Sequence, residues 1–244
     1  MPVRTKAFLI HLGGSALLAA PLVYLVFGLW YPPPLNEAVG ATRMLLVILL
    51  VHVVLGPLLT LLLYVPGKKG LHFDLVVIAC LQLGALSYGL WAMASERPAW
   101  LVFNADRFDL VQASTIDSRH LDLAEPQYRS PPWSGPRWVG ARPSSDWERR
   151  AAMMLEAAAG GADIPQHPEL YLPLDEMTDA IRKRALPLDL LYRHDGPILV
   201  TETLRTWPAA AAWVPLMARS RAMTVLLDDQ YKVVAVVALD PWEQ

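Results

Sequence analysis

The chain has 244 residues, of which 54% are hydrophobic, and it carries a net charge of −2 and a single cysteine. The charge is unevenly divided, because residues 1–95 hold five basic and two acidic residues, whereas residues 96–244 hold 16 basic and 21 acidic ones. This split predicts a weakly basic membrane domain, residues 1–95, followed by an acidic polar domain, residues 96–244. The polar domain has no basic stripe that could neutralise phosphates, which excludes nucleic acid as a partner.

Three apolar runs in the first domain are long enough to cross a lipid bilayer. They cover about residues 8–31, 44–65 and 75–94, and each reaches the roughly 20 residues that span about 30 Å of hydrocarbon. The first run continues past Ala20 to Tyr31 and lacks a small-residue cleavage site, so we expect a retained anchor. The predicted fold class is a membrane protein with three N-terminal transmembrane helices followed by an α+β periplasmic domain.

Basic residues in the short loops set the expected orientation. Arg4 and Lys6 precede the first run, and Lys68 and Lys69 lie between the second and the third. Lysine and arginine favour the cytoplasmic side, so the N-terminus is expected there and residues 96–244 are expected outside the cytoplasm. In a bacterium with two membranes, this predicts a multi-pass protein of the inner membrane with a periplasmic C-terminal domain. Because Cys80 lies within the third run, that domain has no disulfide.

The polar domain is predicted to mix short strands with helices. Two strands are expected around a turn at 104–107, followed by a helix from Ser114 to about Ala124 and a strand near 137–141. One helix is expected to begin after an N-cap at Ser145, and another to cover 174–185. The last signal predicts a C-terminal β-hairpin over 223–239, with its turn at 228–230, at or near the centre of the sheet.

The polar domain shows none of the common catalytic or cofactor patterns. His120, His167 and His194 have no metal-ligand spacing, and we expect them to be solvated surface residues. Gly-rich phosphate loops, GxSxG and SxxK patterns are absent from the sequence. Acidic pairs at 175–176 and 228–229 are explained by a helix first turn and a β-turn. We therefore expect no enzyme activity, no metal and no cofactor.

Polar residues inside the apolar runs are the stronger candidates for function. His11 lies roughly 4–5 Å below the inner boundary and His52 about 12 Å below the outer one, which is too far apart for the two to hold one haem iron. His52, Gly56 and Thr60 share one face of the second run. Pro57 leaves the Val53 carbonyl without an amide donor and favours a kink.

The third run carries a comparable stripe of small and polar residues, with Cys80, Gly84 and Ser87 on one face and Gln82 nearby. Small residues spaced by four let helix backbones approach, and polar side chains then bond across the contact. One interpretation is that both stripes only hold the three spans together. The other is that part of a stripe binds the membrane helix of another protein.

Five segments, spread in order over nearly the whole chain, resemble a known family. They are VLGPLLT (54–60), GLHFDLVVIACLQLGALSYGLW (70–91), RPAWLVFNADRF (97–108), PWSGPRWVGAR (132–142) and TVLLDDQYKVVAVVALDPW (224–242). Together they resemble the TfpX/TfpZ-type type IV pilin accessory proteins of Gram-negative bacteria, whereas residues 153–217 match only loosely. The family pattern has an acidic residue where this chain has His52.

The resemblance implies an inner-membrane factor for type IV pilus biogenesis that binds pilin and supports its stability or assembly, without catalysis. Pilins of this type carry a glutamate a short way in from the cytoplasmic end of their single membrane helix. Counted along the runs, Thr60 lies about 8 Å and Gln82 about 10 Å from that end, whereas His52 lies about 20 Å from it. Thr60, Gln82 and Gly84 are therefore the expected partner-binding residues.

The remaining stripe residues, His52, Gly56 and Pro57, are expected to serve helix packing. Two other functions stay open at this point. One is a membrane-bound enzyme that modifies pilin, and the other is a sensor whose periplasmic domain binds a small ligand.

Overall fold

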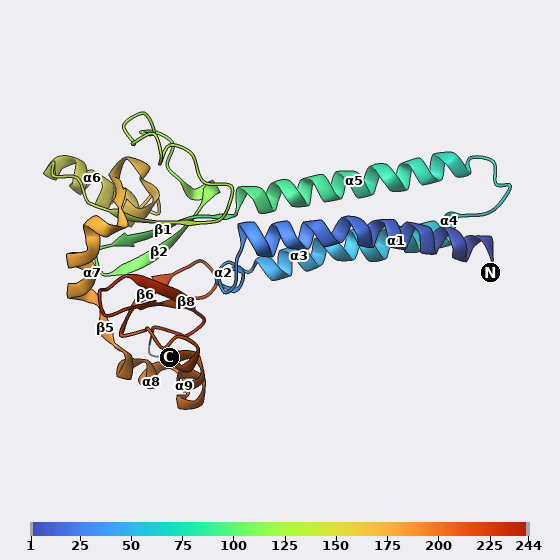
Figure 1. Ribbon diagram of the computed structural model, residues 1–244. Coiled ribbons are helices and arrows are strands. Elements are labelled where there is room, and N and C mark those ends of the chain that lie inside the picture. Colours follow the sequence, from blue (N-terminus) through green and yellow to red (C-terminus); the bar gives the residue numbers. More distant parts are fainter. Residues whose placement is uncertain (1, 243–244) are drawn as a thin grey trace. The chain divides into compact units, whose positions relative to one another are not determined.

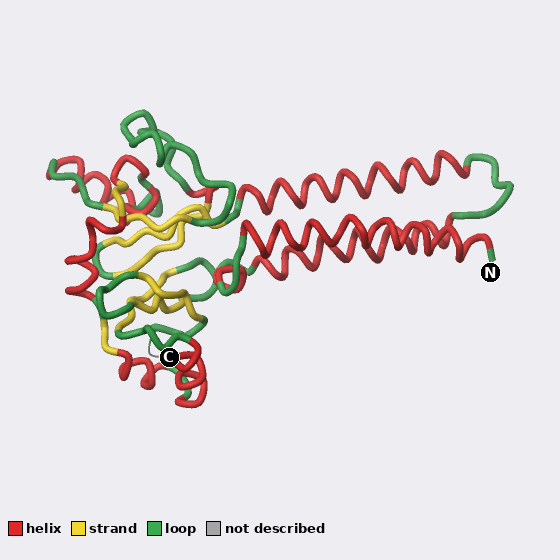
Figure 2. The backbone as a smooth tube through the Cα atoms, in the orientation of Figure 1, coloured by secondary structure: helices red, strands yellow, loops and turns green. Residues whose placement is uncertain are grey.

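A computed structural model describes residues 2–242, and these divide into two compact units. The N-terminal unit comprises the residues up to Pro32 together with Gly40–Ser95, and the C-terminal unit comprises Pro33–Val39 together with the chain from Glu96 onward. Long helices make up the first unit, whereas the second contains a β-sheet with short helices (Figure 2).

Among the described residues, three helices are long and apolar enough to cross a membrane: Val3–Trp30, Ala41–Leu63 and Leu71–Ser95. The first is α1 (Val3–Tyr24) with a π-helical end, η1 (Leu25–Trp30). The second joins α3 (Ala41–Leu49), the π-helix η2 (Leu50–Leu55) and α4 (Gly56–Leu63), and the third is α5 (Leu71–Ser95). The prediction of three N-terminal transmembrane helices is confirmed.

The second span supplies most of the contacts that hold the N-terminal unit together. α1 packs along α4 and η2, and α5 packs along α3, η2 and α4 (Figure 1). The outward-facing side chains are apolar, and Leu17, Leu62 and Phe73 are each at least 70% exposed. Exposed apolar surface of this kind is normal for a helix bundle that lies in lipid.

The C-terminal unit is built on one mixed sheet, whose described strands run in the order β4-β3-β1-β2-β6-β7-β8, with β5 paired to β6. Neighbouring strands are antiparallel, except that β1–β3 and β2–β6 are parallel. The strands are β1 (Pro98–Asn104), β2 (Arg107–Gln112), β3 (Arg137–Ala141), β4 (Tyr171–Pro173), β5 (Leu186–Pro187), β6 (Ala212–Met217), β7 (Met223–Leu227) and β8 (Val233–Val237). The helices of this unit are α2 (Leu35–Ala38), α6 (Trp147–Ala158), α7 (Thr178–Arg184), α8 (Leu191–His194) and α9 (Pro197–Thr206), with 3₁₀ turns at Ala113–Thr115, Ile164–Gln166, Pro168–Leu170, Leu174–Met177 and Leu188–Leu190.

Strand alternation gives the sheet two buried faces. Leu101 and Phe103 of β1 join one core cluster, whereas Trp100 and Val102, which point the opposite way, join another. In the second cluster the Trp100 ring lies edge-on to Tyr171, with 5.5 Å between ring centroids. The sheet is therefore covered on both sides, as the α+β prediction requires.

The segment between the first two spans belongs to this core. Leu35 is 4% exposed and Ala38 is fully buried, and both join the cluster that contains Leu101. The Ala38 carbonyl accepts hydrogen bonds from the amides of Ser220 and Arg221, over 2.9 and 3.2 Å. Since this segment and the chain after the third span fold into one unit, both lie on the same side of the membrane.

The prediction of a helix from Ser114 to about Ala124 is wrong. Only the 3₁₀ turn Ala113–Thr115 forms, and turns follow it. The Asp117 amide donates to the Gln166 carbonyl over 2.8 Å, and the Asp117 carboxylate accepts from the Arg119 amide over 2.9 Å. These bonds compete with a helical ladder, because an aspartate side chain that caps its own turn gives the backbone an alternative partner.

Two further expectations are corrected. The N-cap of α6 is Asp146 and not Ser145, because the Asp146 carboxylate accepts from the amides of Glu148 and Arg149. The C-terminal β-hairpin, β7–β8, is confirmed, but it lies at one end of the strand order and not at its centre. The central position belongs to β1 and β2, whose pairing around the 104–107 turn follows the prediction.

Candidate functional site

The second span changes its helical geometry just before Gly56 and Pro57. Pro57 has no amide hydrogen to bond the Val53 carbonyl, and the chain adopts wider π-helical turns over Leu50–Leu55 before α4 begins. Such turns are rare and occur frequently at functional sites. Here they carry His52, which is 6% exposed.

Gly56 allows α5 to place an amide side chain directly against the second span. A Cβ atom at Gly56 would lie 1.7 Å from Nε2 of Gln82, so only glycine leaves room for this amide. In that space, Gln82 Nε2 donates to the backbone carbonyl of His52 over 3.0 Å. Because a carbonyl only accepts, this bond fixes the orientation of the amide and turns Oε1 the other way.

His11 of α1 connects this amide to the second span. Its Nε2 lies 2.8 Å from Oε1 of Gln82, and its Nδ1 lies 2.6 Å from Oγ1 of Thr60. The amide oxygen only accepts, so Nε2 carries a proton, and Nδ1 accepts from the Thr60 hydroxyl if the ring is neutral. If the ring is an imidazolium, Nδ1 donates instead, and the hydroxyl is free to donate to the Gly56 carbonyl 3.3 Å away.

His11, Thr60 and Gln82 thus form an intramembrane cluster to which each of the three spans contributes one side chain. Thr60 and Gln82 are 4% and 7% exposed. Hydrogen bonds between membrane helices contribute about 0.6 kcal/mol on average, and up to about 1.7 kcal/mol. The cluster therefore links the three helices to one another at a single depth.

A hollow of about 530 Å³ lies beside the intramembrane cluster and is lined by all three spans. We call it the N-terminal hollow. Its polar lining residues are Lys6 and His11 of α1 and Thr60 and Tyr64 at the end of the second span. Apolar residues of α5, including Ile78, form the opposite wall. The Lys6 ammonium group and the Tyr64 hydroxyl group, among apolar walls, suit a carboxylate that is carried by an apolar helix.

The structure separates the predicted partner-binding residues. Thr60 lines the N-terminal hollow, whereas the amide of Gln82 is already bonded within the cluster. Gly84 lies on the outer side of α5, where no heavy atom of the described chain comes within 4 Å of a Cβ position. The residues predicted to serve helix packing are all buried: His52, Gly56 and Pro57.

Sequence reasoning missed His11 as the residue that joins Thr60 to Gln82. As a possible haem ligand, His11 could pair only with His52, which lies at another depth. The depth of each residue in the membrane indicates this pairing, because His11, Thr60 and Gln82 all lie within roughly 5–10 Å of the same boundary. Polar side chains at one depth on neighbouring spans are the ones that can bond to each other.

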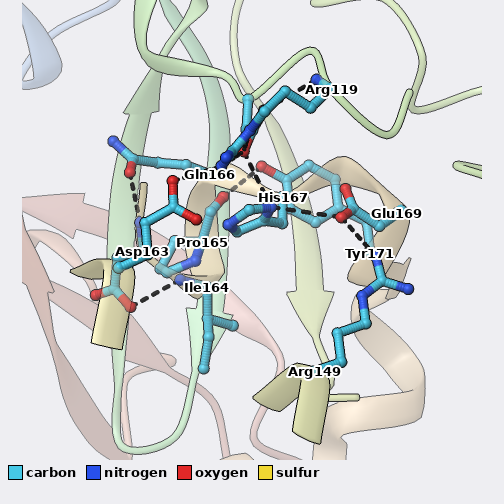
Figure 3. A network of polar contacts seen from close by, with 11 residues as sticks. Arg119, Arg149, Asp163, Ile164, Pro165, Gln166, His167, Glu169 and Tyr171 are labelled. Atoms are coloured by element: carbon cyan, nitrogen blue, oxygen red, sulfur yellow. Dashed lines mark hydrogen bonds and ion pairs between the residues drawn. The ribbon is translucent and has the colours of Figure 1, made fainter. Parts of the chain in front are cut away.

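The expectation of a solvated histidine is wrong at His167, which is 2% exposed. Its Nδ1 lies 3.5 Å from the carboxylate of Asp117 and 3.4 Å from that of Glu169 (Figure 3). Arg119 pairs with Asp117, and Arg149 pairs with Glu169 over 2.9 Å. His120 is exposed as expected, and the side chain of His194 lies outside the described residues.

The two carboxylates beside His167 are stabilised in their ionised form. The Arg119 guanidinium lowers the pKa of Asp117 to about 2. Burial alone would raise the pKa of Glu169, but the nearby His167 ring and the charge of Arg149 outweigh burial and lower it. Among the described residues, no group of three or more His, Cys, Asp and Glu is arranged to hold a metal ion. The network joins the Asp117 turn to the 164–171 segment and to α6.

Comparison with known proteins places these features in context. A family described as "Fimbrial assembly protein FimB" matches residues 1–40. A Dichelobacter nodosus protein named "Fimbrial assembly protein, serogroup I" is 30% identical over 243 residues, covering 96% of this chain and 94% of that relative. The serogroup E1 protein of the same organism is 29% identical over the same shares of both chains. A third relative, named for serogroups C1 and C2, is 34% identical over 109 residues, which is 44% of this chain and 83% of that relative. No solved structure matches the chain.

Proposed function

The chain belongs to the family of fimbrial assembly proteins that serve type IV pilus biogenesis, and we propose that it binds the membrane helix of pilin in the N-terminal hollow. The observation that carries the proposal is the lining of this hollow, where Lys6 and Tyr64 lie among apolar side chains, beside the bonded pair of His11 and Thr60. These groups supply a positive charge and hydrogen-bond partners inside a region that is otherwise hydrocarbon.

The expected ligand is the glutamate that pilins of this type carry near the cytoplasmic end of their membrane helix. A carboxylate in hydrocarbon is costly unless it is paired, so a cation and hydroxyl groups at matching depth favour binding. His11 lies eight residues after the start of α1, which corresponds to about 12 Å along the helix. A glutamate a short way in from the end of its own helix reaches the same depth.

The proposed orientation puts the N-terminus in the cytoplasm and the C-terminal unit in the periplasm, with the three spans in the inner membrane. Its support is the position of the basic residues: Arg4, Lys6, Lys68 and Lys69 all flank the end of the bundle where the hollow lies. The C-terminal unit would then meet the globular head of pilin, which lies on the same side.

The proposed activity is binding and not catalysis. Relatives are named as assembly proteins, and the ring nitrogens of His11 already bond to Thr60 and Gln82. Holding pilin by its membrane helix would stabilise the subunit before it enters the growing pilus.

Co-purification of the full chain with its cognate pilin, in detergent and without a crosslinker, tests the proposal. Lys6→Gln removes the positive charge of the hollow without touching the cluster, and Lys69→Gln is its matched control outside the hollow. We expect pilin recovery to fall severalfold with Lys6→Gln and with a glutamate-to-glutamine pilin, but not with Lys69→Gln. Equal recovery with all three variants would contradict the proposal.

A further inference from the structure

A second hollow in the N-terminal unit is an apolar groove of about 440 Å³ between the second span and α5. We call it the His52 groove. It extends from Arg43 to His52 along the second span, which corresponds to about 14 Å, and α5 contributes Gln82, Ala85 and Ala92. No residue lines both this groove and the N-terminal hollow, as far as the described chain shows.

The groove is shaped by small residues on α5. A Cβ atom at Gly89 would lie 2.7 Å from the Ile48 side chain, so glycine lets α3 and α5 touch there. Ala85 and Ala92 lie one turn to either side of Gly89 and leave the groove open. Small side chains at this spacing allow the backbone of a further helix to approach closely.

His52 is the feature of this groove that calls for a ligand. His52 is only 6% exposed, and it lines the groove. Neither of its ring nitrogens has a hydrogen-bond partner within the described residues 2–242. The intramembrane cluster differs, because its side chains bond to one another. An unpaired polar group in hydrocarbon costs free energy that a leucine at this position would avoid.

We propose that the His52 groove binds a transmembrane helix of a partner protein that presents one hydroxyl, amide or carboxyl group to His52. A lipid chain would fill the apolar walls but would leave both ring nitrogens unpaired. A helix with one polar side chain would both pack against the apolar walls and form a hydrogen bond with the imidazole ring. Both ring nitrogens are covered in this structure, so binding requires the imidazole to rotate about its last torsion, which has a broad energy well, and present a nitrogen to the groove. This inference does not depend on the proposed function, because the two hollows are lined by different residues.

Binding of a synthetic peptide to the full chain in detergent micelles tests the proposal. The probe is a membrane-spanning helix of leucine and alanine with one central asparagine, and its control is the same peptide with leucine at that position. A photoreactive group at Val47, which lines the groove, reports occupancy, and one at Leu62, which lies outside it, reports background. We expect the asparagine peptide to bind roughly three- to fifteenfold more tightly, as for other hydrogen bonds between membrane helices.

Two variants at His52 give the decisive comparison. His52→Leu is expected to abolish the preference for asparagine, and His52→Gln, which keeps a hydrogen-bonding group, is expected to retain it. His52→Leu breaks no hydrogen bond of the described side chains, so its melting temperature should equal or exceed that of the native chain. Equal binding of the two peptides, or a preference that survives His52→Leu, would overturn the proposal.

A spectroscopic measurement on the native chain covers the case in which a variant fails to fold. The nitrogen chemical shifts of the His52 ring, read by NMR with labelled histidine, should change when the asparagine peptide is added and stay unchanged with the leucine peptide. Identical shifts with both peptides would overturn the proposal independently of any variant.

Discussion

Individual glycines decide how closely the membrane helices approach. At Gly56 the missing side chain makes room for the Gln82 amide, and at Gly89 it makes room for Ile48. Gly84, on the same helix as Gly89, has open space where a Cβ would lie. Glycine is therefore needed for close helix contact at Gly56 and Gly89 but not at Gly84. Single substitutions to alanine can distinguish the two cases.

Gly56→Ala is expected to destabilise the N-terminal unit by about 1–3 kcal/mol. The new methyl group displaces the Gln82 amide and breaks its bonds to His11 and to the His52 carbonyl. Gly84→Ala is the matched control and should be neutral or stabilise by up to about 1 kcal/mol, because alanine is the better helix former. Thermal unfolding in detergent measures both, and equal effects of the two variants would contradict the described packing.

A largely buried carboxylate on β2, that of Asp109, gives the C-terminal unit a dependence on pH. Burial raises the pKa of Asp109 to about 6, against the opposing influence of Arg107. The folded state thus holds this proton to higher pH than the unfolded chain, whose aspartates titrate near about 3.9. A raised carboxyl pKa means that stability is lost as the pH rises from about 4 to about 6 and stays lower above it.

Asp109→Asn should therefore stabilise the protein at pH 8 by about 2–3 kcal/mol and have little effect at pH 4. The amide keeps an oxygen for the Arg107 side chain, which bonds the carboxylate over 3.2 Å in the native chain. Asp106→Asn, in the exposed turn before β2, is the control and should change stability little. Melting curves followed by tryptophan fluorescence at both pH values measure the difference, and equal stabilisation at both would refute this account of Asp109.

At the scale of elements, the sequence predicted the spans better than their ends. Apolar runs mark the part of a helix that lies in hydrocarbon, but α1, α3 and α5 begin at Val3, Ala41 and Leu71, because polar flanking residues continue each helix. Pro57 predicted a kink, and the structure has a π-helix at this place. Proline shows that a carbonyl loses its donor, but neighbouring helices decide how the backbone adjusts.

The segment Pro33–Val39 gives an element-level prediction, because it is far in sequence from the sheet that it packs into. Leu35→Ala should cost about 2–4 kcal/mol in the C-terminal unit, as for other buried leucines. Leu123→Ala, at a side chain that is 59% exposed, is the matched control. Hydrogen exchange of β6 and β7 measures the effect, and unchanged protection in Leu35→Ala would contradict the assignment of this segment to the core.

At the scale of the whole molecule, the fold class could be predicted, whereas the way polar residues pair could not. Long apolar runs and β-rich hairpins are local signals, and they identified the spans, the first two strands and the last hairpin. His167 was predicted on the surface because Asp117, one of the two carboxylates beside its ring, is distant in sequence. His11 was missed as a partner of Thr60 and Gln82 for the same reason. Charge and hydrogen-bond pairing depend on tertiary contacts, which a single sequence does not display.

Crosslinking in living cells tests the central claim, that the N-terminal hollow binds pilin, most directly. A photoreactive amino acid at Ile10 or Ala79 lies in the hollow, and one at Leu17 or Leu62 faces away from it on an exposed surface. We expect pilin to be captured from Ile10 and Ala79 but not from Leu17 and Leu62, and capture should weaken when the pilin glutamate is replaced by glutamine. Absence of pilin at the hollow positions, or equal capture at all four, would contradict the account.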